Sequence, residues 1–176
     1  MFQVNGTEIQ ISRGDTGAIL FTAEATRRDT GAAFTFGERD RAVFSIKNGQ
    51  GTVVKQKAYP MTENEFKVIF FNQDTDTLPA GGYIWDVRYV INPYYEDDPP
   101  SGTWPDYSDL TFPVAKGDKC MHEGTYYTAA QAIQTSEEWT PEHWLCADFR
   151  IPVDGDQVIT PQQPMGMNLL TVVGDI

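Results

Sequence analysis

Short β-like runs, separated by turn residues at intervals of about 8 to 14 residues, fill the first half of the chain. No long amphipathic helical pattern interrupts them. Such a succession is typical of two packed antiparallel sheets, so the sequence predicts an all-β fold with an immunoglobulin-like antiparallel β-sandwich. The runs are rich in Val, Ile, Phe, Tyr and Thr, and they predict strands near residues 2–5, 8–12, 17–26, 41–47, 52–58, 64–71 and 81–91.

Three local patterns support this interpretation. Every second residue from Tyr83 to Ile91 is apolar, as in a half-buried antiparallel strand. The pair Asn48-Gly49, between "AVFSIK" and "TVVKQK", tolerates the positive φ angles of a tight turn and predicts a hairpin. The segment "NQDTDTLPAGG" leaves room for one short helical turn, with Asp74 as its capping candidate.

The composition changes after the first 91 residues. The stretch "NPYYEDDPPSGTWPDYSD" is rich in proline and acidic residues, which favours a solvated loop over a strand. Strand patterns return near the C-terminus in "QVIT" and "MNLLTVV". We therefore predict a discontinuous sandwich domain, residues 1–98 and 153–176, that carries an inserted subdomain at residues 99–152, where an insertion adds only loop-closure entropy.

Charge limits the partners that the chain can have. Thirteen basic residues against 25 acidic ones give a net charge of -12, which repels nucleic-acid phosphates and anionic lipid surfaces. We therefore expect neither nucleic acid nor membrane as a partner. The opening "MFQVNGTEIQ" has neither a basic leader nor an apolar run, so we expect synthesis in the cytosol, where cysteines stay reduced.

Three segments carry a resemblance to a known family: "ISRGDTGAILFTA", "DTDTLPAGGYIWDVRYV" and "GDQVITPQQPMGMNLLTVVGDI". They resemble the β-sandwich domain near the N-terminus of upper-baseplate proteins in tailed phages and prophages of Gram-positive bacteria. The resemblance implies a non-enzymatic structural and assembly domain of a virion tail, assembled in the bacterial cytoplasm. It also implies an oligomer whose partners are other tail or baseplate proteins and copies of itself.

The predicted insert resembles another family, the small three-stranded module of the chitin-binding type 3 and family 5/12 carbohydrate-binding group. That module has a Gly-Asp turn, a Gly before an aromatic strand, a Tyr-x-Ala motif and a closing Trp-x-Pro followed by a second Trp. The corresponding positions here are Gly117, Asp118, Gly124, Tyr127, Ala129, Trp139, Pro141 and Trp144. The resemblance implies a three-stranded β insert, and it makes binding of a cell-surface or chitin-like polysaccharide the alternative function.

The sugar-stacking rings of that family are missing from their usual place. After the Tyr-x-Ala motif this chain has "AAQAIQT", which offers no aromatic side chain. The remaining candidates for a carbohydrate platform are Trp104, Tyr107, Tyr126 and Trp139, although Trp139 lies where the module needs its core.

Both cysteines and both histidines of the chain fall inside the insert, as Cys120, His122, His143 and Cys146. These are ordinary zinc ligands, and positions 120 and 122 of a strand share a face, which suits chelation. The spacing differs from the usual zinc patterns, so buried free thiols are the favoured interpretation. A Cys120–Cys146 disulfide is a further alternative if their segments are neighbours in the small sheet.

Acidic residues flank the insert on both sides. Glu96, Asp97 and Asp98 precede it and Asp154 and Asp156 follow it, so a hairpin between the two segments would offer oxygen ligands for calcium. Carboxylate runs are more often simply solvated, and no metal is favoured. The chain has no nucleophile-elbow motif and no phosphate-binding loop, and we predict a protein without catalytic residues or cofactors.

Overall fold

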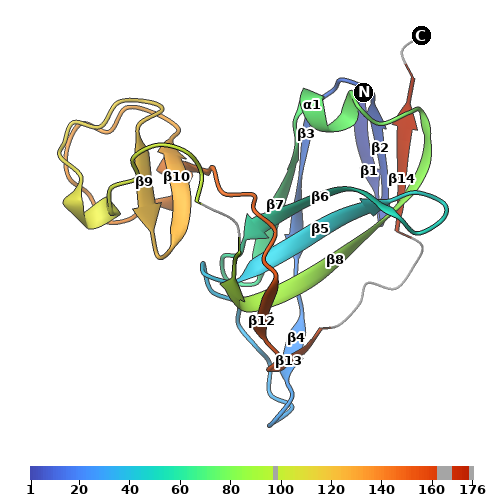
Figure 1. Cartoon of the computed structure of the whole chain (residues 1–176), viewed down its shortest axis with the longest axis horizontal. Coiled ribbons are helices and arrows are strands. Elements are labelled where there is room, and N and C mark those ends of the chain that lie inside the picture. Colours follow the sequence, from blue (N-terminus) through green and yellow to red (C-terminus); the bar gives the residue numbers. More distant parts are fainter. Residues whose placement is uncertain (97–98, 162–167, 175–176) are drawn as a thin grey trace.

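The computed structural model describes residues 1–96, 99–161 and 168–174 and is built almost entirely of strands (Figure 1). Strands account for 49% of it and helices for 6%, which confirms the all-β prediction. The strands are β1 (Phe2–Asn5), β2 (Glu8–Ser12), β3 (Gly17–Thr22), β4 (Ala25–Arg27), β5 (Arg41–Lys47), β6 (Val53–Pro60), β7 (Glu65–Phe70), β8 (Gly81–Tyr94), β9 (Lys119–His122), β10 (Thr125–Ala129), β11 (Trp144–Cys146), β12 (Asp154–Asp156), β13 (Ile159–Pro161) and β14 (Leu169–Val173). The helical pieces are α1 (Asn72–Thr75), η1 (Tyr107–Asp109) and η2 (Pro141–His143). No helix in the described part of the chain is long and apolar enough to cross a membrane.

The sandwich has a large sheet on one side and smaller sheets on the other. The large sheet has the order β1-β2-β14-β8-β5-β6, with β12 paired to the end of β8. The β3–β7 pair packs against its inner face, and the β4–β13 pair extends from one end (Figure 1). The pairing of β2 with β14 is parallel, which departs from the purely antiparallel prediction. The strands that join there come from opposite ends of the described chain, so no local pattern could reveal their direction.

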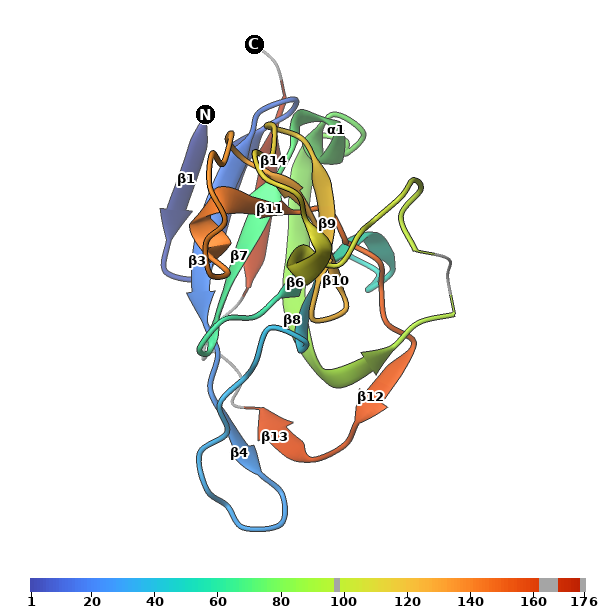
Figure 2. The ribbon, with the colours of Figure 1, turned by 90° about the vertical axis from the view of Figure 1, so that its left-hand side faces the viewer.

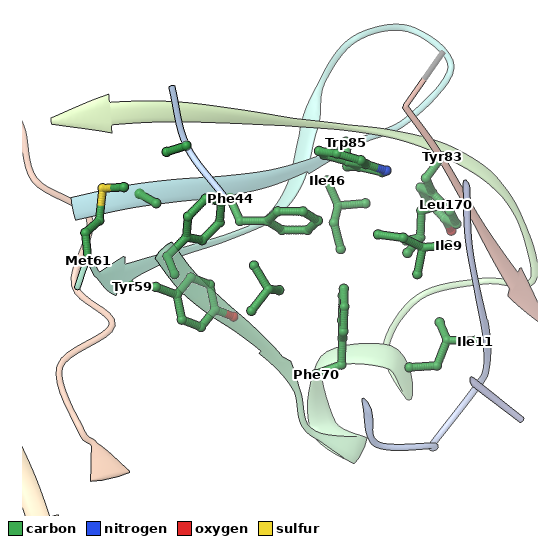
Figure 3. Close-up of a cluster of buried hydrophobic side chains, with 14 of the residues drawn as sticks. Ile9, Ile11, Phe44, Ile46, Tyr59, Met61, Phe70, Tyr83, Trp85 and Leu170 are labelled. Carbon is green, nitrogen blue, oxygen red and sulfur yellow. The ribbon is translucent and has the colours of Figure 1, made fainter. Parts of the chain in front are cut away.

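Aromatic rings fill the space between the two sides (Figure 3). Trp85 of β8 is 3% exposed and stacks on Phe44 of β5, with the ring centroids 5.5 Å apart. Phe70 of β7 meets Phe44 edge-on at 5.9 Å. The Trp85 indole N–H donates to the carbonyl of Thr7 at 2.9 Å, so the buried ring leaves no polar atom unpaired. The alternating pattern of residues 83–91 therefore does place its rings toward the core.

Strand β5 is buried on both faces. Phe44 belongs to the main core, while Val43 points to a small outer cluster with Ala58 and Val90. Ile151, from the segment that follows the insert, packs against this outer cluster. The chain returning from the insert therefore covers part of the outer face of the large sheet.

The hairpin predicted between residues 47 and 53 is present, but its geometry differs from the prediction. The positive φ lies at Gly51 (81°), while the Asn48 side chain accepts hydrogen bonds from the backbone N–H groups of Gln50 and Thr52. The longer loop lets the asparagine act as a local acceptor, so the left-handed residue comes two positions later than Gly49.

One other local prediction needs correction, and a second is confirmed. Residues 17–26 do not form one strand, because β3 pairs with β7 whereas β4 pairs with the distant β13. Asp74 does cap α1: as the third residue of the helix, it accepts from the backbone N–H of Phe71, the N-cap residue. The break between β3 and β4 depends on a strand that is far away in the sequence, whereas the cap is a contact between near neighbours.

The three-stranded insert is confirmed, with the order β11-β10-β9 (Figures 1 and 2). Its own hydrophobic cluster forms around Trp144, Tyr127 and Cys120. The segments that flank it in the sequence pair with each other, since Asp154 of β12 lies opposite Tyr94 of β8. The insert therefore leaves and rejoins the sandwich at one place.

Candidate functional site

The four aromatic residues predicted as a sugar platform are all partly buried, and they separate into two pairs. Trp104 and Tyr126 meet edge-on at 5.2 Å, and Tyr107 and Trp139 meet edge-on at 5.0 Å. The two pairs do not form one coplanar row of rings, which is the arrangement that a flat polysaccharide face would require.

Two rings lie nearly parallel to the indole of Trp139. His122 stacks on it at 4.0 Å with an interplanar angle of 16°, and Trp144 lies nearly parallel to it at 5.7 Å. Tyr107 points its edge at this stack and donates its hydroxyl to the carbonyl of Glu137 at 3.0 Å. Trp139 and Tyr107 are therefore packing residues of the insert, as the sequence position of Trp139 had indicated.

Cationic side chains lie over the rings of the other pair, Trp104 and Tyr126. The Lys119 ammonium lies 4.9 Å from the ring centre of Trp104, and the Arg150 guanidinium lies 5.2 Å from that of Tyr126. The Trp104 indole N–H donates to the carbonyl of Pro100 at 2.7 Å. Because a cation over an aromatic face competes with any sugar ring for that face, this pair is a constrained surface rather than an open platform.

The structure does not bring the four zinc candidates together. His143 is hydrogen-bonded to Glu137 (Nδ1 to Oε1, 2.6 Å), while His122 stacks on Trp139. Across the described ranges, no group of three or more His, Cys, Asp or Glu side chains lies close enough to hold a metal ion. The zinc alternative that rested on Cys120, His122, His143 and Cys146 is therefore wrong for this arrangement.

The disulfide alternative fails because of the strand order. Tyr127 of β10 lies between the two cysteines, opposite Cys120 on one side and Cys146 on the other. Two strand spacings place their backbones about 10 Å apart, beyond the roughly 7 Å limit for a disulfide. Both thiols are free.

Burial keeps both thiols protonated. It raises the pKa of Cys120 to about 12, with the Asp106 carboxylate adding to the rise, and raises the pKa of Cys146 to about 11. The Cys146 thiol also donates to the carbonyl of Asp148 at 3.3 Å. Since the thiolate is the reactive form, these cysteines act as packing residues rather than nucleophiles, with Cys120 in the core of the insert and Cys146 packed against it.

The calcium candidates are only partly within the described residues. Asp97 and Asp98 lie outside them. The hairpin does place Asp154 and Asp156 beside the end of β8, but the Asp156 carboxylate accepts from the side chain of Asn92 at 2.8 Å, and Asp154 accepts from the N–H of Gly155. Glu96 is exposed. No cluster of oxygen ligands forms in the part of this region that the structure covers.

A buried arginine joins the insert to the sandwich. Arg41, the first residue of β5, is 1% exposed. Its guanidinium donates to the carbonyls of Glu38 (2.7 Å) and Asp40 (2.9 Å) and to the hydroxyl of Thr125 in β10, which is itself fully buried. In the sequence, Arg41 resembles an ordinary charged residue at the start of a strand, so no signal identified it.

Further contacts reinforce this joint. Asp148 is 1% exposed and binds Arg150 with both carboxylate oxygens, at 2.9 and 2.8 Å. The Arg150 guanidinium in turn lies 4.4 Å from the ring centre of Tyr95 in the sandwich. Phe149 packs edge-on against Tyr59 of β6. Charged and aromatic contacts therefore fix the insert on the sandwich at several points.

A cleft lies between the insert and the outer face of the β3–β7 pair. It encloses about 450 Å³, within the range of ligand-binding clefts. Figure 2 looks onto this side of the molecule, with β11 in front of β3 and β7. The lining residues are Leu20, Glu38, Tyr59, Pro60, Thr62, Glu65, Phe66, Lys67, Ile69, Tyr127, Trp139, Pro141, Glu142, Trp144, Leu145, Cys146 and Phe149.

The cleft was not predicted from the sequence. Alternation along β3 does place Leu20 on the face opposite Phe21, so one exposed apolar residue could have been expected there. The other wall comes from η2 and β11, whose position depends on the joint around Arg41.

The chain was compared with protein-family models, curated proteins and solved structures. No family model, no curated protein and no solved structure matches the chain. Its function must therefore be argued from the joint, the aromatic packing and the cleft.

Proposed function

We propose that this chain is a non-enzymatic structural and assembly module of a phage or prophage tail, acting in or near the baseplate. The observation that carries this proposal is the buried joint, in which Arg41 of the sandwich donates to Thr125 of the insert. Buried polar contacts of this kind are satisfied in only one geometry, so they hold two lobes at a fixed distance and orientation. A fixed spacer is what a component of a large symmetric assembly requires.

The packing of the insert's aromatic rings supports the same function. Trp139 stacks with both His122 and Trp144, and the hydrophobic cluster of the insert includes Tyr107 and Trp139 together with Trp144. These rings stabilise the lobe. The aromatic content that resembles a carbohydrate module is thus mostly used in internal packing.

Antibody labelling of particles tests this proposal. Antibodies raised against the purified chain should label the distal end of the tail on particles released from the source bacterium, as seen by electron microscopy. The same antibodies after absorption with the purified chain serve as the control. Particles that assemble, infect and contain none of this chain by mass spectrometry would refute the proposal.

The alternative function is recognition of a cell-surface or chitin-like polysaccharide, and the observation that favours it is the partial exposure of Trp104 and Tyr126. If the structural role is correct, the chain should not sediment with insoluble chitin or purified cell walls above the level of an unrelated acidic protein. Retention that is lost in both the Trp104→Ala and the Tyr126→Ala variant, but kept in Val53→Ala, would instead support glycan binding.

A further inference from the structure

We infer that the cleft between the insert and the β3–β7 pair binds a basic, apolar, extended segment of a partner protein. This inference rests on the proposed assembly function, because it names the kind of partner that the module would hold. It is supported by two properties of the cleft: exposed aliphatic side chains on both walls and an excess of carboxylates.

Aliphatic side chains are exposed on both walls. Leu20 of β3 is 62% exposed and Leu145 of β11 is 54% exposed. Pro141 is exposed beside Leu145, and Ile69 of β7 is partly exposed on the sandwich side. Covering each leucine would contribute roughly 1–2 kcal/mol, so a segment that inserts apolar side chains between the walls has a clear driving force.

Carboxylates outnumber cations in the lining. Glu38, Glu65 and Glu142 face a single lysine, Lys67, among the lining residues. Lys67 lies directly opposite Leu20 in the β3–β7 ladder, and Glu65 lies opposite Thr22. A partly desolvated cleft with this balance of charge attracts a segment with Lys or Arg side chains and repels an acidic one.

Two other occupants fit less well. A second copy of this chain has a net charge of -12 and would be repelled by the first. A sugar ring needs an exposed aromatic face, yet Tyr59, Phe66, Tyr127 and Trp144 in this cleft are each at most 7% exposed. The other two rings of the lining, Trp139 and Phe149, are only partly exposed. The most exposed apolar side chains of the lining, Leu20 and Leu145, are aliphatic, which suits contact with the apolar side chains of a protein segment.

Short dye-labelled peptides test the inference on the full chain. Three probes with alternating sequence are used: Leu–Lys, Leu–Glu and Ser–Lys. Fluorescence anisotropy should show that Leu–Lys binds at least about tenfold more tightly than either of the others, because only it supplies both apolar contacts and positive charge. Equal binding of Leu–Lys and Leu–Glu would overturn the inference.

Two double variants test whether the Leu–Lys peptide binds in the cleft. The double variant Leu20→Ser/Leu145→Ser should weaken Leu–Lys binding about tenfold or more, since two aliphatic contacts are lost. The control, Val53→Ser/Ile84→Ser, removes two exposed apolar residues that do not line the cleft (44% and 46% exposed) and should bind like the unaltered chain. Equal effects of the two double variants would overturn the inference. So would concentration-dependent dimerisation that only the cleft variant abolishes, because the occupant would then be a second copy.

The two proposals can fail separately. If the antibodies label the particles but the cleft variants bind the Leu–Lys peptide as well as the control variants do, the assembly function stands without this site. If the peptides bind in the cleft but the particles lack the chain, the site stands and the assembly function fails.

Discussion

Replacement of Arg41 with methionine is expected to lower the free energy of unfolding by about 3–5 kcal/mol. Methionine retains an unbranched apolar side chain but removes every donor. The carbonyls of Glu38 and Asp40 and the hydroxyl of Thr125 would then lose their guanidinium partner in a region with almost no solvent contact. Guanidinium chloride unfolding followed by circular dichroism measures the change.

Arg39→Met is the matched control, because Arg39 is exposed and lies two residues away. It makes the same change in net charge, and it should cost less than about 0.5–1 kcal/mol. Hydrogen exchange adds a readout of the joint itself, since the amides of β9 to β11 should lose more protection in Arg41→Met than the amides of β3 and β7. Equal destabilisation by the two variants would show that Arg41 has no special role.

Trp85→Ala is expected to destabilise the sandwich by about 3–5 kcal/mol, the typical cost of removing a large buried ring. The substitution would leave a cavity beside Phe44 and Phe21, whose rings contact the indole at centroid distances of 5.5 and 5.4 Å. It would also leave the carbonyl of Thr7 without its donor. The midpoint and slope of urea unfolding report the loss.

Trp104→Ala deletes the same atoms at a partly exposed position near the start of the insert. Its contacts are Tyr126, the Lys119 ammonium and the carbonyl of Pro100, so a loss of about 1–2 kcal/mol is expected. A similar loss for both tryptophans would contradict the assignment of Trp85 to the main core.

Features that depend on neighbouring residues were predicted well. The alternation from Tyr83 to Ile91 predicted one long half-buried strand, and β8 places Trp85 in the core as expected. The turn residues at Asn48 and Gly49 predicted a hairpin, although the left-handed residue proved to be Gly51. Alternation and turn chemistry act over a few residues, so they can be read along the chain.

Features that depend on distant partners were not predicted. Cys120 and Cys146 suggested a bridge, but β10 intervenes and separates them. His122 and Trp139 suggested a metal ligand and a sugar platform, yet they stack on each other. Residue type indicates what a side chain can bind. Only the surrounding packing decides whether it is available to bind it.

The sequence by itself determined the β class and the positions of most strands of the sandwich, because these follow from local stereochemistry and the period of apolar residues. The three-stranded insert was implied by a resemblance to a known module and not by alternation. The tertiary structure decided the parallel pairing of β2 with β14, the burial of Arg41 against Thr125 and the cleft between Leu20 and Leu145. Each of these brings together residues that are far apart along the chain. The burial and the electrostatic environment of a side chain depend on all such neighbours, so they are determined only once the chain has folded.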